Sequence, residues 1–388
     1  MRSLISYSFV ILAFSLYTGV TGNDSYNLLP KHFEIIGFSA SETGFIMGFT
    51  GIGAMLMLPF VALFIDHFRQ KRILTGALII QLCIPLFYFL EVPFPRLYAA
   101  ARFVQGGTFS VMMISYTAAL SFIIPSDRRS WGYAIFGIMG QLGGLTSFAL
   151  GESIYDAYGF FPLYVFTLVL FGISITLIQF FPEKKNFDDS QKPKLSDFGA
   201  VFKQKQLYPA LYWILILGLA FGTMLSFIPK IIMERGLEKV GPFFIAYPLT
   251  VALLRLTLGS FFDRFSKKIV LFIPIIMVPV SLFMVSIVHS YALLIIAGIC
   301  YGVAHGVMFP VLLAYLMEHA PVQFRARMSL IFQFLFNFGL FLSANIGGYI
   351  AEISVRWTFI GMALFSITGV LLLCYLIIYG KTVKRSIP

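Results

Sequence analysis

Long apolar segments alternate with short polar segments along the whole chain. Each apolar segment holds about 18 or more residues with almost no charge, which is long enough to cross about 30 Å of hydrocarbon as a helix. Lipid offers no hydrogen-bond partners to the backbone, so such segments must be helical. The pattern predicts twelve membrane spans, at residues 5–29, 42–65, 73–90, 97–123, 131–155, 161–181, 208–229, 242–262, 269–288, 291–317, 327–350 and 357–379.

Composition agrees with this pattern and excludes several classes of protein. Of the 388 residues, 59% are hydrophobic and 12% are charged, against about 25% charged in a soluble domain. The net charge of +11 does not indicate nucleic-acid binding, because the basic residues lie in short loops between apolar segments. Neither a metal site nor a cofactor is expected, because the three cysteines lie inside predicted spans without ligand spacing: Cys83, Cys300 and Cys374.

Basic residues are unevenly divided between the two sets of loops. Twenty of the 28 Lys and Arg residues fall on the side that also holds both termini, and six fall on the other side. The positive-inside rule therefore predicts cytoplasmic termini. Arg2 and the small residues near Gly19–Gly22 resemble a signal peptide. We interpret this segment as the first span, because the apolar run is long and the repeat described next requires it.

A polar stretch at residues 182–207 divides the chain into halves at 1–181 and 208–388 that resemble each other. The repeat predicts an all-α integral membrane protein with two six-helix halves related by a pseudo-twofold axis, a recurring plan of secondary transporters. The matching positions are Leu29-Pro30-Lys31 with Ile228-Pro229-Lys230, Gly37 with Gly236, Gly44 with Gly241, Asp66 with Asp263, and Gly151 with Gly348.

The loops that follow the second span of each half resemble the signature of the major facilitator superfamily, Gly-x-x-x-Asp-Arg-x-Gly-Arg-Arg/Lys. The second half keeps the signature with Ser266 in place of glycine, and its matching residues are Gly259, Asp263, Arg264, Lys267 and Lys268. The first half keeps less, namely Asp66, Arg69, Lys71 and Arg72. The resemblance implies a charge latch that gates the transporter. The alternative is that these residues only set the topology.

Two further segments resemble signatures of the same family. Arg102-Phe-Val-Gln105-Gly106-Gly107 resembles the Arg-x-x-Gln-Gly signature of proton-coupled members, and Arg255 fits the pattern that precedes the second-half loop, so it joins the predicted latch. The run from Gly137 to Gly144 is a loose version of the antiporter signature, with Gln141 where proline is expected. The resemblance implies alternating access and coupling to protons.

Burying an ionisable residue in a membrane span costs free energy, so such a residue indicates a functional role. Asp24 in the first span and Arg102 in the fourth lie at similar depths, about 8 Å below the outer surface at 1.5 Å per residue. We therefore predict a charge pair in which Asp24 exchanges a proton, the alternative being a permanent ion pair. Glu152 is a candidate second acid, or an interfacial residue.

Polar residues elsewhere in the spans are candidates to bind substrate. His305 lies midway along its span among Gly298, Gly302 and Gly306, which are expected to allow close helix packing. It would bind substrate or protons, or else form part of a hydrogen-bonded core. No phenylalanine is assigned to an aromatic substrate site. The other substrate-binding candidates are Asn23, Gln105, Tyr116, Gln141, Gln333 and Asn337.

These features favour proton-coupled export of a lipophilic or amphipathic compound. Its partners would be a small-molecule substrate, protons and the lipid bilayer, and the chain would act as a monomer in a bacterial cytoplasmic membrane. The alternative within transport is uptake or exchange of a small anion or metabolite, with Arg102 and Arg255 as anion ligands. An intramembrane lipid-modifying enzyme would need a catalytic constellation, and the sequence contains no H-E-x-x-H or Walker A motif. A sensor is the remaining class.

Overall fold

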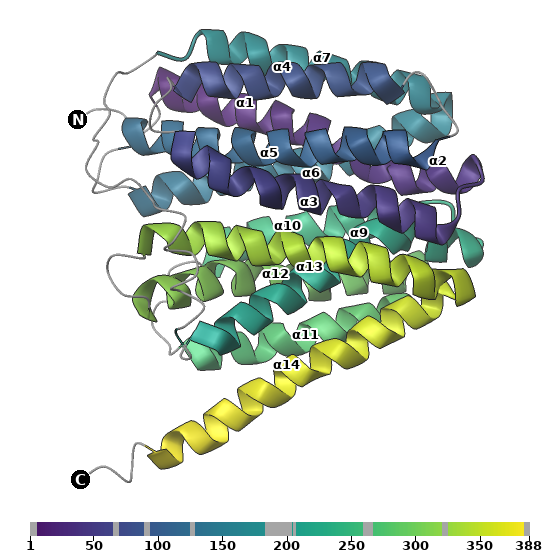
Figure 1. The fold of residues 1–388 in the computed structure, drawn as a ribbon, viewed down its shortest axis with the longest axis vertical. Helices are drawn as coiled ribbons and strands as arrows, with labels where there is room; N and C mark the ends of the chain where they lie inside the picture. The colour runs from purple at the N-terminus through teal and green to yellow at the C-terminus, as the bar shows by residue number, and fades with distance from the viewer. Residues whose placement is uncertain are drawn as a thin grey trace.

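The computed structural model describes residues 6–64, 70–88, 94–124, 129–182, 204, 207–258, 267–319 and 325–383. These residues form helices and no strand (Figure 1). The elements are α1 (Tyr7–Asp24), the 3-10 helix η1 (Ser25–Leu28), α2 (Leu29–Ile35), α3 (Ala40–Phe64), α4 (Gln70–Tyr88), α5 (Pro95–Ile123), α6 (Arg129–Tyr158), α7 (Phe160–Gln179), α9 (Tyr208–Glu234), α10 (Gly241–Leu258), α11 (Lys267–Ser286), α12 (Tyr291–His319), α13 (Arg325–Ile353) and α14 (Val355–Val383).

Twelve of the described helices, all except η1 and α2, hold 18 to 30 residues, and each overlaps one predicted span. Eight are long and apolar enough to cross a membrane. Of the other four, α10 is apolar but short, whereas α1, α5 and α6 carry polar residues such as Asp24, Arg102 and Glu152. The helices that are least apolar are therefore those on which the sequence placed the candidate site.

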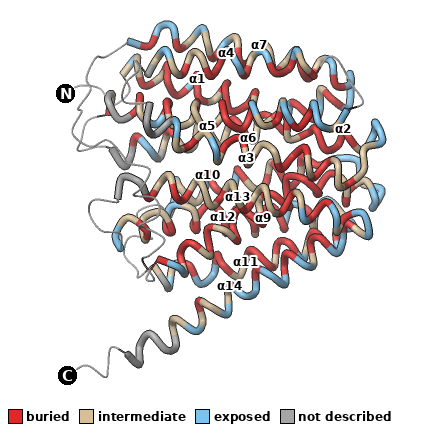
Figure 2. The backbone as a smooth tube through the Cα atoms, in the orientation of Figure 1, coloured by how far each residue is buried: buried red, intermediate tan, exposed pale blue. Residues whose placement is uncertain are grey.

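Burial is uneven around the bundle. Within the protein, 83% of the most apolar segment of α9 is buried, against 22% of that of α14. Large apolar side chains are exposed on α14, including Trp357, Leu364 and Leu371. Buried positions follow the faces where helices meet (Figure 2). Exposed apolar surface of this extent is the expected surface of a helix that faces lipid.

The first predicted span differs from the structure, because it is not one continuous helix. The α-helical segment ends at Asp24, a 3-10 turn follows, and α2 continues the helical path to Ile35. The side chain of Ser25 donates a hydrogen bond to the backbone oxygen of Thr21 (2.9 Å) and so competes for a helix acceptor at the start of the turn. The matching helix of the second half, α9, is α-helical from Tyr208 to Glu234. Asp24 therefore lies where α-helical geometry changes to the tighter 3-10 geometry.

The structure has the two-halved architecture that the sequence repeat predicted. Helices α1 to α7 form one half and α9 to α14 the other, and α1 begins at the same end of the molecule at which α14 ends (Figure 1). Gly37 after α2 and Gly236 after α9 both have left-handed backbone, with φ of 84° and 70°. Glycine adopts this conformation without strain, so the repeated glycines end matching helices in the same way.

The halves meet along two helix pairs. One pair, here called the glycine seam, is α3 against α13. A Cβ atom added to Gly44 would lie 2.1 Å from the backbone oxygen of Ala344, and one added to Gly51 would lie 2.6 Å from that of Asn337. The backbones therefore touch directly, as at the small-residue interfaces of membrane helices. The second pair, α6 against α10, is called the charged seam and carries the candidate site.

The glycine seam predicts that even a methyl group on Gly44 is disruptive. Gly44→Ala places a Cβ inside the contact distance of a backbone atom, so the halves must separate at a cost of about 1–3 kcal/mol. We expect a lower thermal unfolding midpoint in detergent. Gly76→Ala is the matched control, because no atom lies within 4 Å of its added Cβ. Equal midpoints for the two variants would contradict the close approach.

Candidate functional site

Asp24 and Arg102 are joined by a chain of hydrogen bonds through two side-chain amides. The Asn23 Nδ2 group donates to Asp24 Oδ1 (3.0 Å). The Gln105 Nε2 group donates to Asn23 Oδ1 (3.1 Å), and Arg102 Nη1 donates to Gln105 Oε1 (2.6 Å). The direct charge pair predicted from sequence is therefore not formed in this structure. Asp24 and Arg102 are instead connected by hydrogen bonds through Asn23 and Gln105. The sequence analysis predicted that these two amides bind substrate.

The hydrogen bonds of this network all run in one direction. Each amide donates from its NH₂ group on the side of Asp24 and accepts with its oxygen on the side of Arg102. Arg102 is buried, with 2% of its surface exposed, so its charge depends on these partners. Gln81 of α4 positions Gln105, since its Nε2 donates to the backbone oxygen of Gln105 and to Thr108 Oγ1, both at 2.9 Å. The sequence analysis missed Gln81, although a glutamine inside the apolar span at 73–90 was a signal for it.

The carboxylate of Asp24 faces the charged seam. A Cβ atom added to Gly144 of α6 would lie 2.9 Å from Asp24 Oδ2, so a side chain there would displace the acid. The carboxylate also acts electrostatically on the hydroxyl of Tyr247, which belongs to α10 of the other half. The glycine-rich segment that resembles an antiporter signature thus allows α1 to pack closely on α6, with Gly143 against the α1 backbone and Gly144 against Asp24.

An aromatic cluster surrounds His305 in the second half. Tyr247 and His305 share a hydrogen bond between the hydroxyl and Nδ1 (3.2 Å). Five rings have centroids within 6.0 Å of the imidazole centroid, those of Phe221, Tyr247, Tyr301, Phe309 and Phe336. Sequence analysis assigned no phenylalanine to such a site, because the rings come from α9, α10, α12 and α13. Gly298, Gly302 and Gly306 pack against α10, as predicted.

Three other candidates do not join Asp24. Tyr116 is buried in the core of the first half, where its hydroxyl meets those of Ser15 (2.7 Å) and Ser174 (3.0 Å). The Asn337 Nδ2 group donates to the backbone oxygen of Gln333 (2.8 Å) on its own helix. Gln141 lies on the glycine-rich stretch of α6, and its side chain makes no hydrogen bond to any residue that the structure describes.

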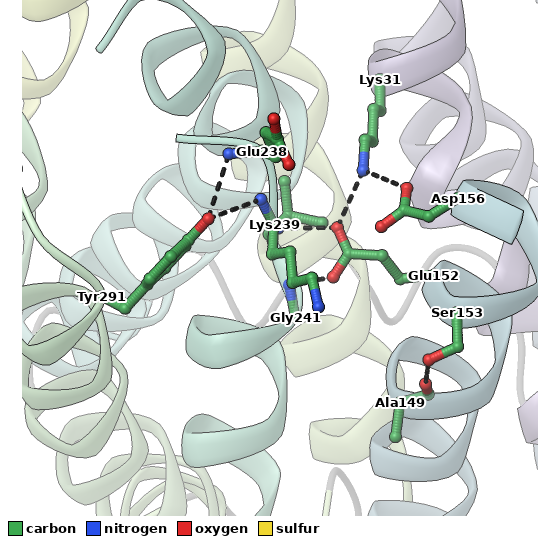
Figure 3. A network of polar contacts seen from close by, with 10 residues as sticks. Lys31, Ala149, Glu152, Ser153, Asp156, Glu238, Lys239, Gly241 and Tyr291 are labelled. Atoms are coloured by element: carbon green, nitrogen blue, oxygen red, sulfur yellow. Dashed lines mark hydrogen bonds and ion pairs between the residues drawn. The ribbon is translucent and has the colours of Figure 1, made fainter. Parts of the chain in front are cut away.

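Glu152 binds the N-terminus of α10 across the charged seam (Figure 3). Its Oε1 accepts from the backbone N–H of Val240 (2.7 Å) and from Lys31 Nζ (3.1 Å), and its Oε2 accepts from the N–H of Gly241 (2.6 Å). Lys31 also pairs with Asp156 (2.7 Å). A carboxylate at a helix N-terminus is favourable because it meets unpaired N–H groups and the positive end of the dipole.

The glycine seam carries a related contact. Glu352 of α13 accepts a hydrogen bond from the N–H of Ser41 at the start of α3 (2.8 Å), and Lys230 pairs with Glu34 (2.9 Å) between α9 and α2. Each half therefore offers a glutamate to the second long helix of the other half. The topology predicted from the sequence puts this end of the molecule outside the cell, so we call these contacts the outer latch, comprising Lys31, Glu34, Glu152, Asp156, Lys230, Glu352 and the first amides of α3 and α10.

Most of the gating signature predicted at the opposite end lies outside the described residues, namely Asp66, Arg69, Gly259, Asp263 and Arg264. The backbone of Lys268 is described but its side chain is not. Lys71 donates to the backbone oxygens of Gln179 (2.5 Å) and Phe181 (3.0 Å), Arg72 is exposed, and Lys267 pairs with Glu318. These contacts stay within one half, so the latch role of this signature remains a prediction.

Comparison with known proteins places this fold. The sequence model of the Major Facilitator Superfamily matches residues 4–247 and 239–387. The chain belongs to the Major Facilitator Superfamily. It is accordingly a multi-pass integral membrane transporter rather than an enzyme. Superfamily transporters bind small-molecule substrates, which is the role for which a polar site between two halves is suited.

Two curated relatives come from Staphylococcus aureus. The staphylopine export protein (strain Mu50 / ATCC 700699) is 21% identical over 381 residues, which cover 93% of this chain and 94% of that protein. The quinolone resistance protein NorA of the same strain is 25% identical over 157 residues. That match covers 40% of each chain, so less than half the length of NorA is matched.

Solved structures share the fold at low identity. A point mutant of the nucleoside transporter NupG has a TM-score of 0.81 at 15% identity, covering 95% of this chain and 99% of that one. The human organic anion transporter MFSD10 (TETRAN) has a TM-score of 0.71 at 13% identity, covering 95% and 100%. At these identities the likeness establishes the fold alone.

The amide chain predicts that Gln105 stabilises the folded protein. Gln105→Leu leaves the buried Arg102 guanidinium without its acceptor, which costs about 1–3 kcal/mol. We expect a lower thermal unfolding midpoint in detergent. Gln141→Leu is the matched control, because the side chain of Gln141 makes no described hydrogen bond. A Gln105→Leu midpoint equal to that of the control would refute the chain.

The outer latch predicts that Glu152 keeps this side of the charged seam closed. Glu152→Gln weakens the bonds to α10 and Lys31, so the seam should open more often by about tenfold, since charge-assisted hydrogen bonds carry about 1.5–3 kcal/mol. The readout is maleimide labelling, from outside the cell, of Phe244→Cys in a chain lacking Cys83, Cys300 and Cys374. Glu238→Gln, at an exposed position outside the latch, is the control. Labelling at the control rate would rule out the latch.

Proposed function

We propose that this transporter exports an amphipathic compound in exchange for protons, and that Asp24 is the coupling residue. One observation carries the proposal. A 3-10 turn begins directly after Asp24, and the Asp24 carboxylate lies against Gly144 of α6 in the charged seam. A stretch of 3-10 helix between α-helical segments often marks a functional hinge, and ionisable groups inside a helical bundle mark ion and substrate pathways.

The amide chain supplies a physical account of coupling. Asn23, Gln105 and Arg102 stabilise the ionised form of Asp24, while the surrounding apolar helices penalise it. Either a proton or a cationic group on a substrate relieves that penalty. Because both compete for one carboxylate, binding of a proton from outside releases the substrate, and loss of the proton inside prepares the site again.

Alternating access requires the site to open to one side at a time. In the topology we propose, twelve spans with both termini in the cytoplasm, the outer latch faces outside. Closure of that side is supported by Glu152 on the amides of α10, by Glu352 on the amide of Ser41 and by the pair of Lys230 with Glu34. The contacts of Glu352 and of the Lys230–Glu34 pair are the more exposed ones, so breaking them costs little free energy because water replaces the partner. The latch is therefore suited to repeated opening.

Export as the direction is supported by the curated relatives. Their names describe quinolone resistance and staphylopine export, and the second relative matches along nearly the whole chain. Both identities are low, so the compound transported by this chain is argued from its own residues below.

Uptake or exchange of a small anion is the second candidate. It is favoured by Arg255, whose guanidinium reaches the other half without a described acceptor. Under this alternative an isolated anion would bind between Arg255 and Arg102. The buried position of Arg102, bonded to Gln105 within the first half, favours export instead.

Transport by inverted vesicles tests the proposal. We expect lipophilic cationic dyes to accumulate when a proton gradient is imposed and to leave when it is collapsed. Asp24→Asn should lower accumulation by about tenfold or more and remove its dependence on the gradient, since one charged contact is lost. Asp24→Glu keeps the charge and tests for partial rescue, and Glu238→Gln at an exposed site is the control. Full gradient-dependent transport by Asp24→Asn would exclude Asp24 as the coupling residue.

A further inference from the structure

The charged seam presents its groups at successive depths along α6 and α10. Below the outer latch, Phe148 and Phe244 stack face to face, with centroids 4.1 Å apart and planes at 6°. Next inward, Asp24 lies against Gly144, within electrostatic reach of Tyr247. The stacked pair thus separates the Asp24 level of the seam from the outer latch.

Arg255 lies deeper along the same seam and crosses it. Its Nη1 atom would be 2.7 Å from a Cβ added to Gly137, so the guanidinium of the second half occupies the space that a glycine of the first half leaves. It forms no hydrogen bond or ion pair with any part of the chain that the structure describes. Its charge acts on Tyr247 and His305, which belong to the aromatic cluster.

An arginine at this depth requires an acceptor. Its guanidinium stays charged and offers five N–H donors with no acceptor of its own. Intramembrane charges that have a role face a cavity or the inside of the bundle. Arg255 is half-buried, and its guanidinium lies against Gly137 across the seam, so it meets these conditions.

The two opposite charges of the seam lie at different levels. Asp24 contacts Gly144 and Arg255 contacts Gly137, which are seven residues apart on α6, about 10 Å along a helix that rises 1.5 Å per residue. Asp24 and Arg255 form no ion pair. Tyr247, on the same helix as Arg255, joins the aromatic cluster through its hydrogen bond to His305.

We propose that the substrate of this transporter is an aromatic zwitterion, whose cationic group binds Asp24 and whose carboxylate binds Arg255. The inference rests on the proposed export function and names the substrate class for the same site. A carboxylate matches the planar fork of a guanidinium with two parallel hydrogen bonds. The aromatic body would pack on the Tyr247 side of the cluster, where rings also favour a nearby cation.

A ligand with a single charge pairs with only one of the two charged groups of the seam. A cation at Asp24 leaves Arg255 without an acceptor among the described residues, and an anion at Arg255 leaves Asp24 Oδ2 without a described donor. A zwitterion of suitable length offers a partner to both groups, so neither stays unpaired in a low-dielectric site. Specificity then arises because a molecule lacking one group leaves a protein charge unpaired.

Three matched probes test this in proteoliposomes with an imposed proton gradient. Norfloxacin carries both a carboxylate and an ammonium group, its ethyl ester keeps only the ammonium, and its N-acetyl derivative keeps only the carboxylate. We expect the wild type to prefer norfloxacin to either derivative by about tenfold. Arg255→Gln should remove that preference over the ester and leave ester transport within about twofold, since the ester does not use the guanidinium. Arg255→Lys should retain part of the preference.

Two controls separate a substrate contact from a general loss of folding or gating. Gly137→Ala keeps the charge but displaces the guanidinium, and should also weaken norfloxacin selectively. Arg356→Gln removes an exposed arginine and should change nothing. Equal loss of all three probes in Arg255→Gln would show a gating role and overturn the inference, as would a wild type with no preference for norfloxacin.

Binding measured by calorimetry in detergent distinguishes failure of this inference from failure of the proposed function. Arg255-dependent binding of norfloxacin without gradient-driven transport would support the zwitterion site and contradict proton-coupled export. Gradient-driven dye transport with no Arg255-dependent binding would support export and overturn the zwitterion site.

Discussion

A carboxylate and a guanidinium placed in an apolar bundle need partners, and here each reaches the other through two amides. The chain from Asp24 through Asn23 and Gln105 to Arg102 gives Asp24 Oδ1 a donor and Arg102 Nη1 an acceptor, whereas the buried Arg102 Nε has no partner among the described residues. Other features support it. A 3-10 turn begins directly after Asp24, Gln81 donates to the backbone oxygen of Gln105 on α5, and Gly144 leaves space for the carboxylate.

The two seams between the halves differ in kind. Along the glycine seam, backbone meets backbone at Gly44 and Gly51, so van der Waals contact holds α3 to α13. Along the charged seam, two glycines of α6 instead leave space that side chains fill: Asp24 lies against Gly144 and Arg255 lies against Gly137. Under the proposed function, this arrangement confines binding to one seam while the other maintains the contact between halves.

The outer latch contains the same kind of contact twice, a glutamate of one half bound to the first amides of a helix in the other half. The two glutamates differ in burial. Glu152 is buried and accepts three hydrogen bonds, whereas Glu352 is exposed and accepts from the Ser41 N–H in contact with water. Exposed charge pairs contribute little because water competes for them, and buried ones lose more when a partner leaves. The contact beside the candidate site is therefore the stronger of the two.

The sequence alone predicted the all-helical fold, the two halves and the approximate positions of the long helices, because membrane spans depend on local apolar length and the repeat is visible as matched residues. It did not predict the 3-10 turn after Asp24. It also identified Asp24, Arg102 and Glu152, since charges inside spans are rare. Only the tertiary structure decided what these residues contact. The two amides between Asp24 and Arg102, the helix N-terminus bound by Glu152 and the rings around His305 come from different helices. Their distances depend on how those helices pack, and no local pattern in the chain records that packing.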